Sequence, residues 1–250
     1  MRAAILSLLL LSGWFAGTGA RAEAAAPTCE VPASLLASDS KLDHVETAVK
    51  SGRPLNVLVV GSGSSTIATQ QASAYPARLS AMLKDKLGAT VPVDLSVEIQ
   101  SRKTAEDVAG TLVKLVEAKR PTLVIWQTGT YDAIRGIDPD DFRSAVDEGV
   151  TALQKAGVDV VLVNLQYSPR TETMTSAPPY LDNMRVVAQQ RDIPLFDRFA
   201  IMRHWNDSGD FDLFSATHGV ELAKRVHDCL GRALSKFVLD AAHLDQAQQN

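Results

Sequence analysis

The sequence predicts an α/β fold in which helices cover both faces of a parallel five-stranded sheet. Two observations predict it. Short apolar runs alternate along the chain with longer segments of helical spacing, an order that is typical of parallel sheets. Hydrophobic residues make up 46% of the 250 residues and charged residues 22%, which is ordinary for a globular protein and excludes wholesale disorder. We therefore expect one α/β domain with a sizeable core.

The elements of the first half follow from their apolar patterns. Residues 55–60 (LNVLVV) are a continuous apolar run that predicts a buried strand, and residues 75–87 carry apolar side chains at helical spacing. Residues 91–99 alternate between apolar and polar side chains and predict a second strand. A helix then begins at Thr104, a favourable N-cap that is followed by acidic residues in the first turn.

The second half repeats this alternation. Residues 121–127 and 158–165 predict two more buried strands, and the helical segment between them, residues 141–156, ends at Gly157 as its C-cap. The last expected elements are a helix over 180–190, a short strand over 193–196 and a closing helix over 220–239.

The N-terminus predicts a secretory signal peptide over residues 1–22. Arg2 precedes an uncharged apolar run, and Ala20-Arg21-Ala22 fits the small-x-small cleavage pattern. The run is shorter than the ~20 apolar residues that span a bilayer, and an uncleaved anchor is the alternative. We expect a periplasmic or secreted protein without a stable membrane span after cleavage. Its parts are an arm over 23–50, a domain over 51–240 and a polar tail over 241–250.

The chain has two cysteines, Cys29 and Cys229. An exported protein meets an oxidising compartment, so we expect these residues to form a disulfide that ties the arm to the closing helix. Two separate thiols are the alternative.

Charge and histidine spacing exclude two classes of ligand. The net charge of −4 argues against nucleic-acid binding, which needs a basic face. The histidines at positions 44, 204, 218, 227 and 243 lack the spacing of a metal-ligand pair. We expect no metal and no cofactor.

The most suggestive loop is Gly-Ser-Gly-Ser-Ser at residues 61–65, directly after the first strand. In parallel sheets the chemistry lies beyond the carboxyl ends of the strands. A hydroxyl at this point could act as a nucleophile, with free backbone N–H groups stabilising an oxyanion. The same N–H groups could bind phosphate, or the loop could be a plain turn. It lacks the Lys of a P-loop and the third Gly of a dinucleotide fingerprint.

Four segments resemble, in order and spacing, the blocks of the SGNH, or GDSL-type, hydrolases: VLVVGSGSSTI, TLVIWQTGTYDAIRG, VVLVNLQYSPR and DLFSATHGVELA. The resemblance covers residues 55–239. It implies a flavodoxin-like three-layer α/β/α sandwich and a serine esterase or acylhydrolase. It also implies a small-molecule or glycan ester as the substrate.

The resemblance implies that Ser64 is the nucleophile. The family's nucleophile lies two residues before a Thr, and Thr66 is that Thr here. Alignment on Gly61 instead gives a different position, so Ser62 and Ser65 stay open as alternatives.

The oxyanion donors implied by the resemblance are Gly63, Gly129 and Tyr131. Tyr131 stands where the family usually has an Asn, and the segment around Arg102 has no Gly where the family offers a Gly N–H group. A Tyr hydroxyl can also donate a hydrogen bond.

The general base is the largest departure from the family. Asp212 fits the Asp of the family's Asp-x-x-His pair, but Ser215 stands at the His position, and Ser cannot act as a base near neutral pH. His218 is the favoured substitute and His204 the second candidate. The departures leave open a second function, a catalytically degenerate domain that serves as a cell-envelope binding or accessory protein.

Overall fold

The structure, a computed structural model, describes residues 29–88, 91–214 and 219–244. At its centre is a five-stranded sheet in the order β2-β1-β3-β4-β5, in which every neighbouring pair is parallel. The predicted α/β fold with a parallel five-stranded sheet is confirmed. The strands are β1 (Leu55–Gly61), β2 (Val93–Ile99), β3 (Leu123–Gln127), β4 (Asp159–Val163) and β5 (Leu195–Phe196).

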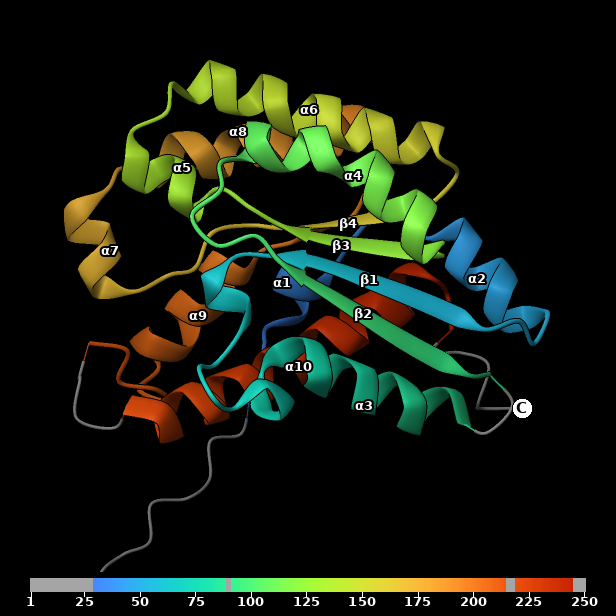
Figure 1. The fold of residues 1–250 in the computed structure, drawn as a ribbon. Coiled ribbons are helices and arrows are strands. Elements are labelled where there is room, and N and C mark those ends of the chain that lie inside the picture. Colours follow the sequence, from blue (N-terminus) through green and yellow to red (C-terminus); the bar gives the residue numbers. More distant parts are fainter. Residues whose placement is uncertain (1–28, 89–90, 215–218, 245–250) are drawn as a thin grey trace, which may run out of the picture.

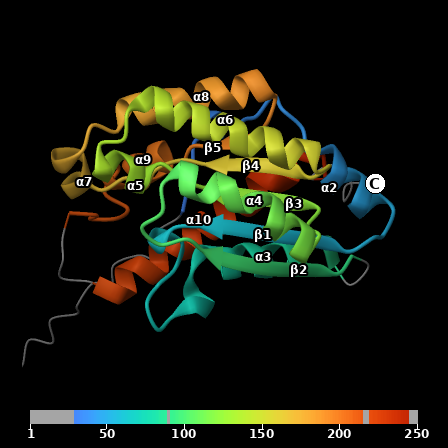
Figure 2. The same ribbon diagram turned by 45° about the horizontal axis from the view of Figure 1, so that its top comes forward.

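Helices cover both faces of the sheet and make three layers (Figures 1 and 2). One face carries α4, α6 and α8, which pack side by side, and the opposite face carries α3 and α10, which pack against each other. The long helices are α3 (Tyr75–Leu87), α4 (Ala105–Lys119), α6 (Pro139–Lys155), α8 (Pro178–Arg191) and α10 (Gly219–Ala241).

Short helices make up much of the N-terminal segment and also follow several strands at the carboxyl edge of the sheet. Two single turns of 3₁₀-helix, η1 (Gly63–Ser65) and η2 (Gln71–Ser73), follow β1. The short α-helices are α1 (Ala33–Leu36), α2 (Asp43–Lys50), α5 (Thr130–Arg135), α7 (Pro169–Met174) and α9 (Arg198–Asp207).

Strands β2 to β5 begin one or two residues later than the apolar patterns suggest. Three of these late starts coincide with a proline, because Pro92 and Pro194 directly precede β2 and β5, and Pro121 lies just ahead of β3. Proline has no N–H group to donate to a neighbouring strand, so it is found at the entrance of a strand rather than inside it.

Residues 29–50, the described part of the segment expected as an arm, pack against the rest of the fold. Leu42 and Val45 are fully buried, and the N–H group of Leu42 donates to the carbonyl of Ala241 at 3.0 Å. The core also runs past residue 240, since Leu244 is buried. Apolar residues spaced three apart place one face of α2 against the sheet, a pattern hidden in a segment of mostly polar composition.

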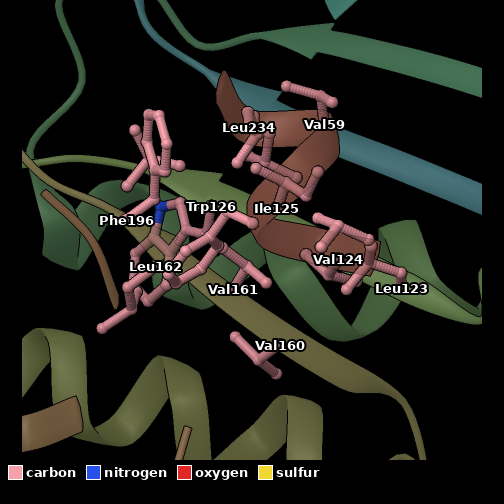
Figure 3. Close-up of a cluster of buried hydrophobic side chains, with 14 of the residues drawn as sticks. Val59, Leu123, Val124, Ile125, Trp126, Val160, Val161, Leu162, Phe196 and Leu234 are labelled. Atoms are coloured by element: carbon pink, nitrogen blue, oxygen red, sulfur yellow. The ribbon is translucent and has the colours of Figure 1, made fainter. Parts of the chain in front are cut away.

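The core lies on both faces of the three central strands. All residues of β3 and β4 are buried, whereas β2 at the edge is only partly buried. Figure 3 shows part of this core, in which side chains of β3 and β4 meet Phe196 of β5 and Leu234 of α10. Strands that are buried on both faces read as continuous apolar runs, and this is why the sequence located them.

A disulfide joins Cys29 and Cys229, whose Cα atoms lie 5.1 Å apart. This is the pairing that the sequence predicted between the N-terminal segment and the closing helix. No helix within the described residues combines the length and the apolar character needed to cross a membrane.

Candidate functional site

The Ser-rich loop forms a tight turn at the carboxyl end of β1. Ser62 caps η1, because its Oγ accepts a hydrogen bond from the N–H group of Ser64 at 3.3 Å. The N–H group of Ser65 donates to the carbonyl of Ser62 at 2.9 Å. The turn exposes Gly63, leaves Ser62 and Ser64 half-buried and turns Ser65 inward.

Gly61 makes this turn possible by close approach. A Cβ atom at this position would lie 2.2 Å from Oγ of Ser65 and 2.6 Å from its Cβ. Real Cβ atoms do not come that close, so the strand can bend over Ser65 only without a side chain at residue 61.

Ser65 lies inside the protein and is 1% exposed. Its hydroxyl contacts the hydroxyl of Tyr75 at 3.2 Å and also bonds to Oε1 of Gln127. Such low exposure makes Ser65 the least accessible of the three hydroxyls to a substrate carbonyl. Of the three candidate nucleophiles, Ser62 and Ser64 are therefore the more accessible ones.

Gln127, the last residue of β3, binds all three serines through its side-chain amide. Nε2 donates to Oγ of Ser62 at 2.7 Å and to Oγ of Ser64 at 2.9 Å. Oε1 accepts hydrogen bonds from Ser65, Tyr75 and Arg198. A guanidinium group can only donate, so its contact with Oε1 fixes which end of the amide faces Ser64.

Arg198 completes the surroundings of Ser64. This residue opens α9 and is 1% exposed. Its Nη1 donates to Oγ of Ser64 at 3.1 Å, and its Nη2 donates to the carbonyl of Ser64 at 3.1 Å. Burial lowers the pKa of Arg198 to about 10, so the guanidinium keeps its charge at neutral pH. A buried positive charge thus lies against the oxygen of Ser64.

His227 on α10 contacts Tyr75, whose hydroxyl bonds to Gln127. His227 is buried, and its Nδ1 accepts a hydrogen bond from the N–H group of Tyr75 at 3.0 Å. Burial, followed by the nearby charge of Arg198, lowers the pKa of His227 to about 3. The imidazole is therefore neutral, with its proton on Nε2, and its Nδ1 lone pair is already used.

The predicted oxyanion donors in the second block, Gly129 and Tyr131, make local contacts in the described structure, and their role stays a prediction. Gly129 caps α5 with a φ of +94°, and its N–H group helps to offset the burial that raises the pKa of the Asp132 carboxyl. The hydroxyl of Tyr131 accepts a hydrogen bond from Nη1 of Arg135 at 3.5 Å. Asp132 also accepts from the N–H group of Ala105 at 2.8 Å, so this block ties α5 to the start of α4.

The predicted base stays a prediction. His218 and Ser215 lie outside the described residues. Asp212 is exposed, and its Oδ1 accepts a hydrogen bond from the N–H group of Phe214 at 3.1 Å. His204 is half-buried on α9 and has no hydrogen bond to Ser64 within the described part of the chain.

Two larger hollows lie near this region of the fold. A pocket of about 350 Å³ adjoins Ser65 and Thr66 and is walled by apolar side chains of β2 and α3. A cleft of about 960 Å³ lies among α7, α8 and α9, with the exposed side chains of Met174 and Phe214 at its rim. The described residues contain no group of three or more His, Cys, Asp or Glu side chains that could hold a metal ion.

Sequence reasoning missed Gln127, Arg198 and His227. Gln127 is the polar end of a buried strand, and that was a usable signal, because a polar residue at this place faces the carboxyl edge of the sheet. Arg198 lay next to Asp197 in an ordinary helix start, and His227 lay on the apolar stripe of the closing helix. Nothing in those local patterns marks the contact of Arg198 with Ser64 or that of His227 with Tyr75.

Solved structures with the same fold include esterases, and their sequence identity to this chain is low. TesA is 21% identical with a TM-score of 0.55, and the match covers 73% of this chain and 99% of that one. The psychrotrophic esterase EstA from Pseudoalteromonas sp. is 17% identical with a TM-score of 0.56, over 73% and 98% of the two chains. A two-domain esterase active on acetylated mannans is 13% identical with a TM-score of 0.66, over 85% of this chain and 57% of that one.

These likenesses show the fold, and they confirm the expected SGNH-type architecture. No curated protein matches the sequence. The model of one protein family matches residues 28–244, a span that begins next to the disulfide at Cys29 and ends where the described structure ends. On that match, the chain belongs to the Non-GDSL lipase-like family.

Proposed function

We propose that the protein is a carboxylic ester hydrolase with Ser64 as its nucleophile. One observation carries the proposal. The half-buried Oγ of Ser64 accepts hydrogen bonds from a buried guanidinium group and from the amide of Gln127. Charge-assisted donors on an oxygen favour its negatively charged form. These contacts would make the hydroxyl of Ser64 a better nucleophile than a solvated serine.

The reaction would pass through an acyl-enzyme. Oγ of Ser64 attacks the ester carbonyl carbon while a base takes the hydroxyl proton, and the tetrahedral intermediate then expels the alcohol, which takes that proton. Water cleaves the acyl-enzyme in the same manner. We propose His218 as the base and Asp212 as the residue that orients it, as the family resemblance implies.

The pocket beside Thr66 and the cleft among α7, α8 and α9 suggest where the acyl part and the alcohol part of the ester would bind. The apolar pocket beside Thr66 would suit a short acyl chain, because its walls are mostly Ala, Leu, Val and Ile side chains. The larger cleft has mixed polar and apolar walls and would suit the alcohol side, such as a sugar. The neighbour that acts on acetylated mannans supports a glycan ester.

We also propose that the protein acts outside the cytoplasm. The disulfide between Cys29 and Cys229 supports this location, because disulfides persist in oxidising compartments. The apolar N-terminal run of the sequence agrees with export.

Fluorophosphonate labelling of the full chain tests the nucleophile. Wild-type protein should be labelled, and Ser64→Ala should not. Ser62→Ala and Ser65→Ala should keep the label, and loss of the label in one of these variants instead would identify that residue as the nucleophile. His218→Ala should lower the hydrolysis rate of p-nitrophenyl acetate by about 10²- to 10⁴-fold.

A second function has one observation in its favour. Within the described residues, the nitrogen atoms that contact Oγ of Ser64 are both donors, and neither can take its proton. A domain without catalysis that holds an acylated glycan would need no base. Wild-type protein that neither reacts with the fluorophosphonate nor hydrolyses acetyl esters, yet binds an acetylated oligosaccharide, would favour this function.

A further inference from the structure

A third cavity is lined by Arg198 but not by Ser64. It has a volume of about 180 Å³ and is lined by residues of α9, the start of α10 and the loop after β4. Its lining includes Arg198, Met202, Leu222, Val226 and His227. We call it the Arg198 cavity. It is smaller than the roughly 300–1,000 Å³ typical of pockets for drug-sized molecules, so only a small ligand fits.

Arg198 brings an unmatched positive charge to this cavity. Nη1 donates to Ser64 and Gln127, and Nη2 donates to the carbonyl of Ser64. The remaining nitrogen, Nε, is buried without a hydrogen-bond partner in the described structure. None of the described carboxylates forms an ion pair with Arg198. Because a buried charge without a counter-ion is costly, the site is complementary to an anion.

His227 brings a second donor to the same cavity. Its Nδ1 accepts from the N–H group of Tyr75, so the proton of the neutral imidazole is on Nε2. Nε2 makes no hydrogen bond within the described residues. Arg198 and His227, from different helices, thus line one small space, and each keeps one nitrogen donor without a partner among the described residues.

The other walls combine polar side chains, Gln166, Tyr167 and Ser168, with an apolar part. Met202, Leu222 and Val226 offer only carbon and sulfur surface, which suits a short hydrocarbon chain and not a hydrated inorganic ion. A ligand that fits both parts has one anionic head and a short apolar tail.

We propose that the Arg198 cavity binds a short-chain monocarboxylate, with the carboxylate against Arg198 and His227 and the chain against Met202 and Leu222. The acid released by ester cleavage belongs to this chemical class. The binding itself does not depend on the proposed hydrolysis, and it can be measured in Ser64→Ala.

Isothermal titration calorimetry of full-length Ser64→Ala with butyrate tests the proposal. Butyramide, which has the same shape without the charge, is the matched ligand, and sodium chloride at equal ionic strength is the control. Butyrate should bind at least tenfold more tightly than butyramide. Equal binding of the two ligands, no butyrate binding, or displacement by equimolar chloride would overturn the proposal.

Variants locate the site. Ala223 lines the cavity and is half-buried, so Ala223→Leu should fill the space and weaken butyrate binding at least tenfold. Val220→Leu on the exposed side of the same helix should leave it unchanged. His227→Asn keeps an acceptor for Tyr75 but removes the Nε2 donor, and it should also weaken binding. Thermal unfolding checks that each variant is folded. Unchanged affinity in both Ala223→Leu and His227→Asn would place the binding elsewhere and refute the proposal.

Discussion

The hydroxyl of Ser65 lies between Tyr75 and Gln127, so its removal should affect stability and not reactivity. We predict that Ser65→Ala lowers the free energy of unfolding by about 1–3 kcal/mol, the usual cost of breaking a buried hydrogen-bonded group. Urea unfolding measures this loss, and fluorophosphonate labelling of the folded variant should stay at the wild-type rate. A variant of full stability that no longer reacts would show that Ser65 and not Ser64 is attacked.

His227 predicts a pH dependence of stability. Its pKa is about 3 in the folded protein and near 6.5 in the unfolded chain, so between these values the unfolded chain binds a proton that the folded protein does not. The free energy of unfolding should therefore fall as the pH decreases below 6.5, by at most about 1.4 kcal/mol per pH unit from this group.

Urea unfolding at several pH values between neutral and 4.5 should show this fall in wild-type protein and a smaller one in His227→Asn, which cannot titrate. The difference between the two proteins isolates His227 from the carboxylates, which titrate in both. Parallel stability curves would contradict the buried neutral imidazole.

At this scale the sequence indicated the loop that carries Ser64 but not the residues around it, and the role of Ser64 as nucleophile stays a prediction. The position of Ser64 follows from a local pattern, a glycine-rich turn after an apolar strand. Its partners Gln127 and Arg198 are 63 and 134 residues away along the chain, and only the sheet order brings them together. Such contacts have no local signature.

The helix α4 illustrates the next scale, because a side chain outside it fixes its start. Oγ1 of Thr104 accepts from the N–H group of Asp107 at 3.3 Å, and Oδ2 of Asp107 accepts from the N–H group of Thr104 at 3.1 Å. The second bond is the main cause of the lowered pKa of Asp107. This reciprocal pair is a capping box, and it confirms Thr104 as the predicted N-cap.

We predict that Thr104→Ala lowers the free energy of unfolding by about 1 kcal/mol, since the N–H group of Asp107 loses its partner. Thr111→Ala is the control, because the hydroxyl of Thr111 bonds within the same helix to a carbonyl of the preceding turn. It should change stability by less than about 0.5 kcal/mol. Equal losses in both variants, measured by urea unfolding, would argue against a specific cap.

Elements were predicted best where the pattern was strong and local. The apolar runs of β1 and β3 and the cap of α4 are of this kind. The helix α2 was missed because its short apolar face lies within a polar segment, and Asp159 of β4, which binds a backbone N–H group in its first turn, is distant in sequence. The carboxylate of Asp159 accepts from the N–H group of Val45 at 2.9 Å, a contact that only the folded chain reveals.

At the scale of the whole molecule, the disulfide encloses nearly the entire fold. Cys29 and Cys229 are separated by 200 residues, so the bond restricts the unfolded chain strongly. We predict that Cys29→Ser with Cys229→Ala lowers the free energy of unfolding by about 2–4 kcal/mol. Alanine suits position 229 because this residue is buried.

Guanidinium unfolding with and without dithiothreitol tests this prediction. The reductant should shift the wild-type protein to the stability of the double variant and leave the double variant unchanged. A reductant effect on both proteins would mean that it acts through something other than this bond.

The same bond decides how the protein would carry a mechanical load. A pulling force applied ahead of Cys29 and behind Leu244 would pass through the sulfur bridge into α10, and only the stretch from residue 229 to residue 244 would lie in its path. The sheet and the other helices would lie outside the path of the force and would bear no load. Reduction of the bond would bring the enclosed 200 residues into line and release about 700 Å of extensible chain.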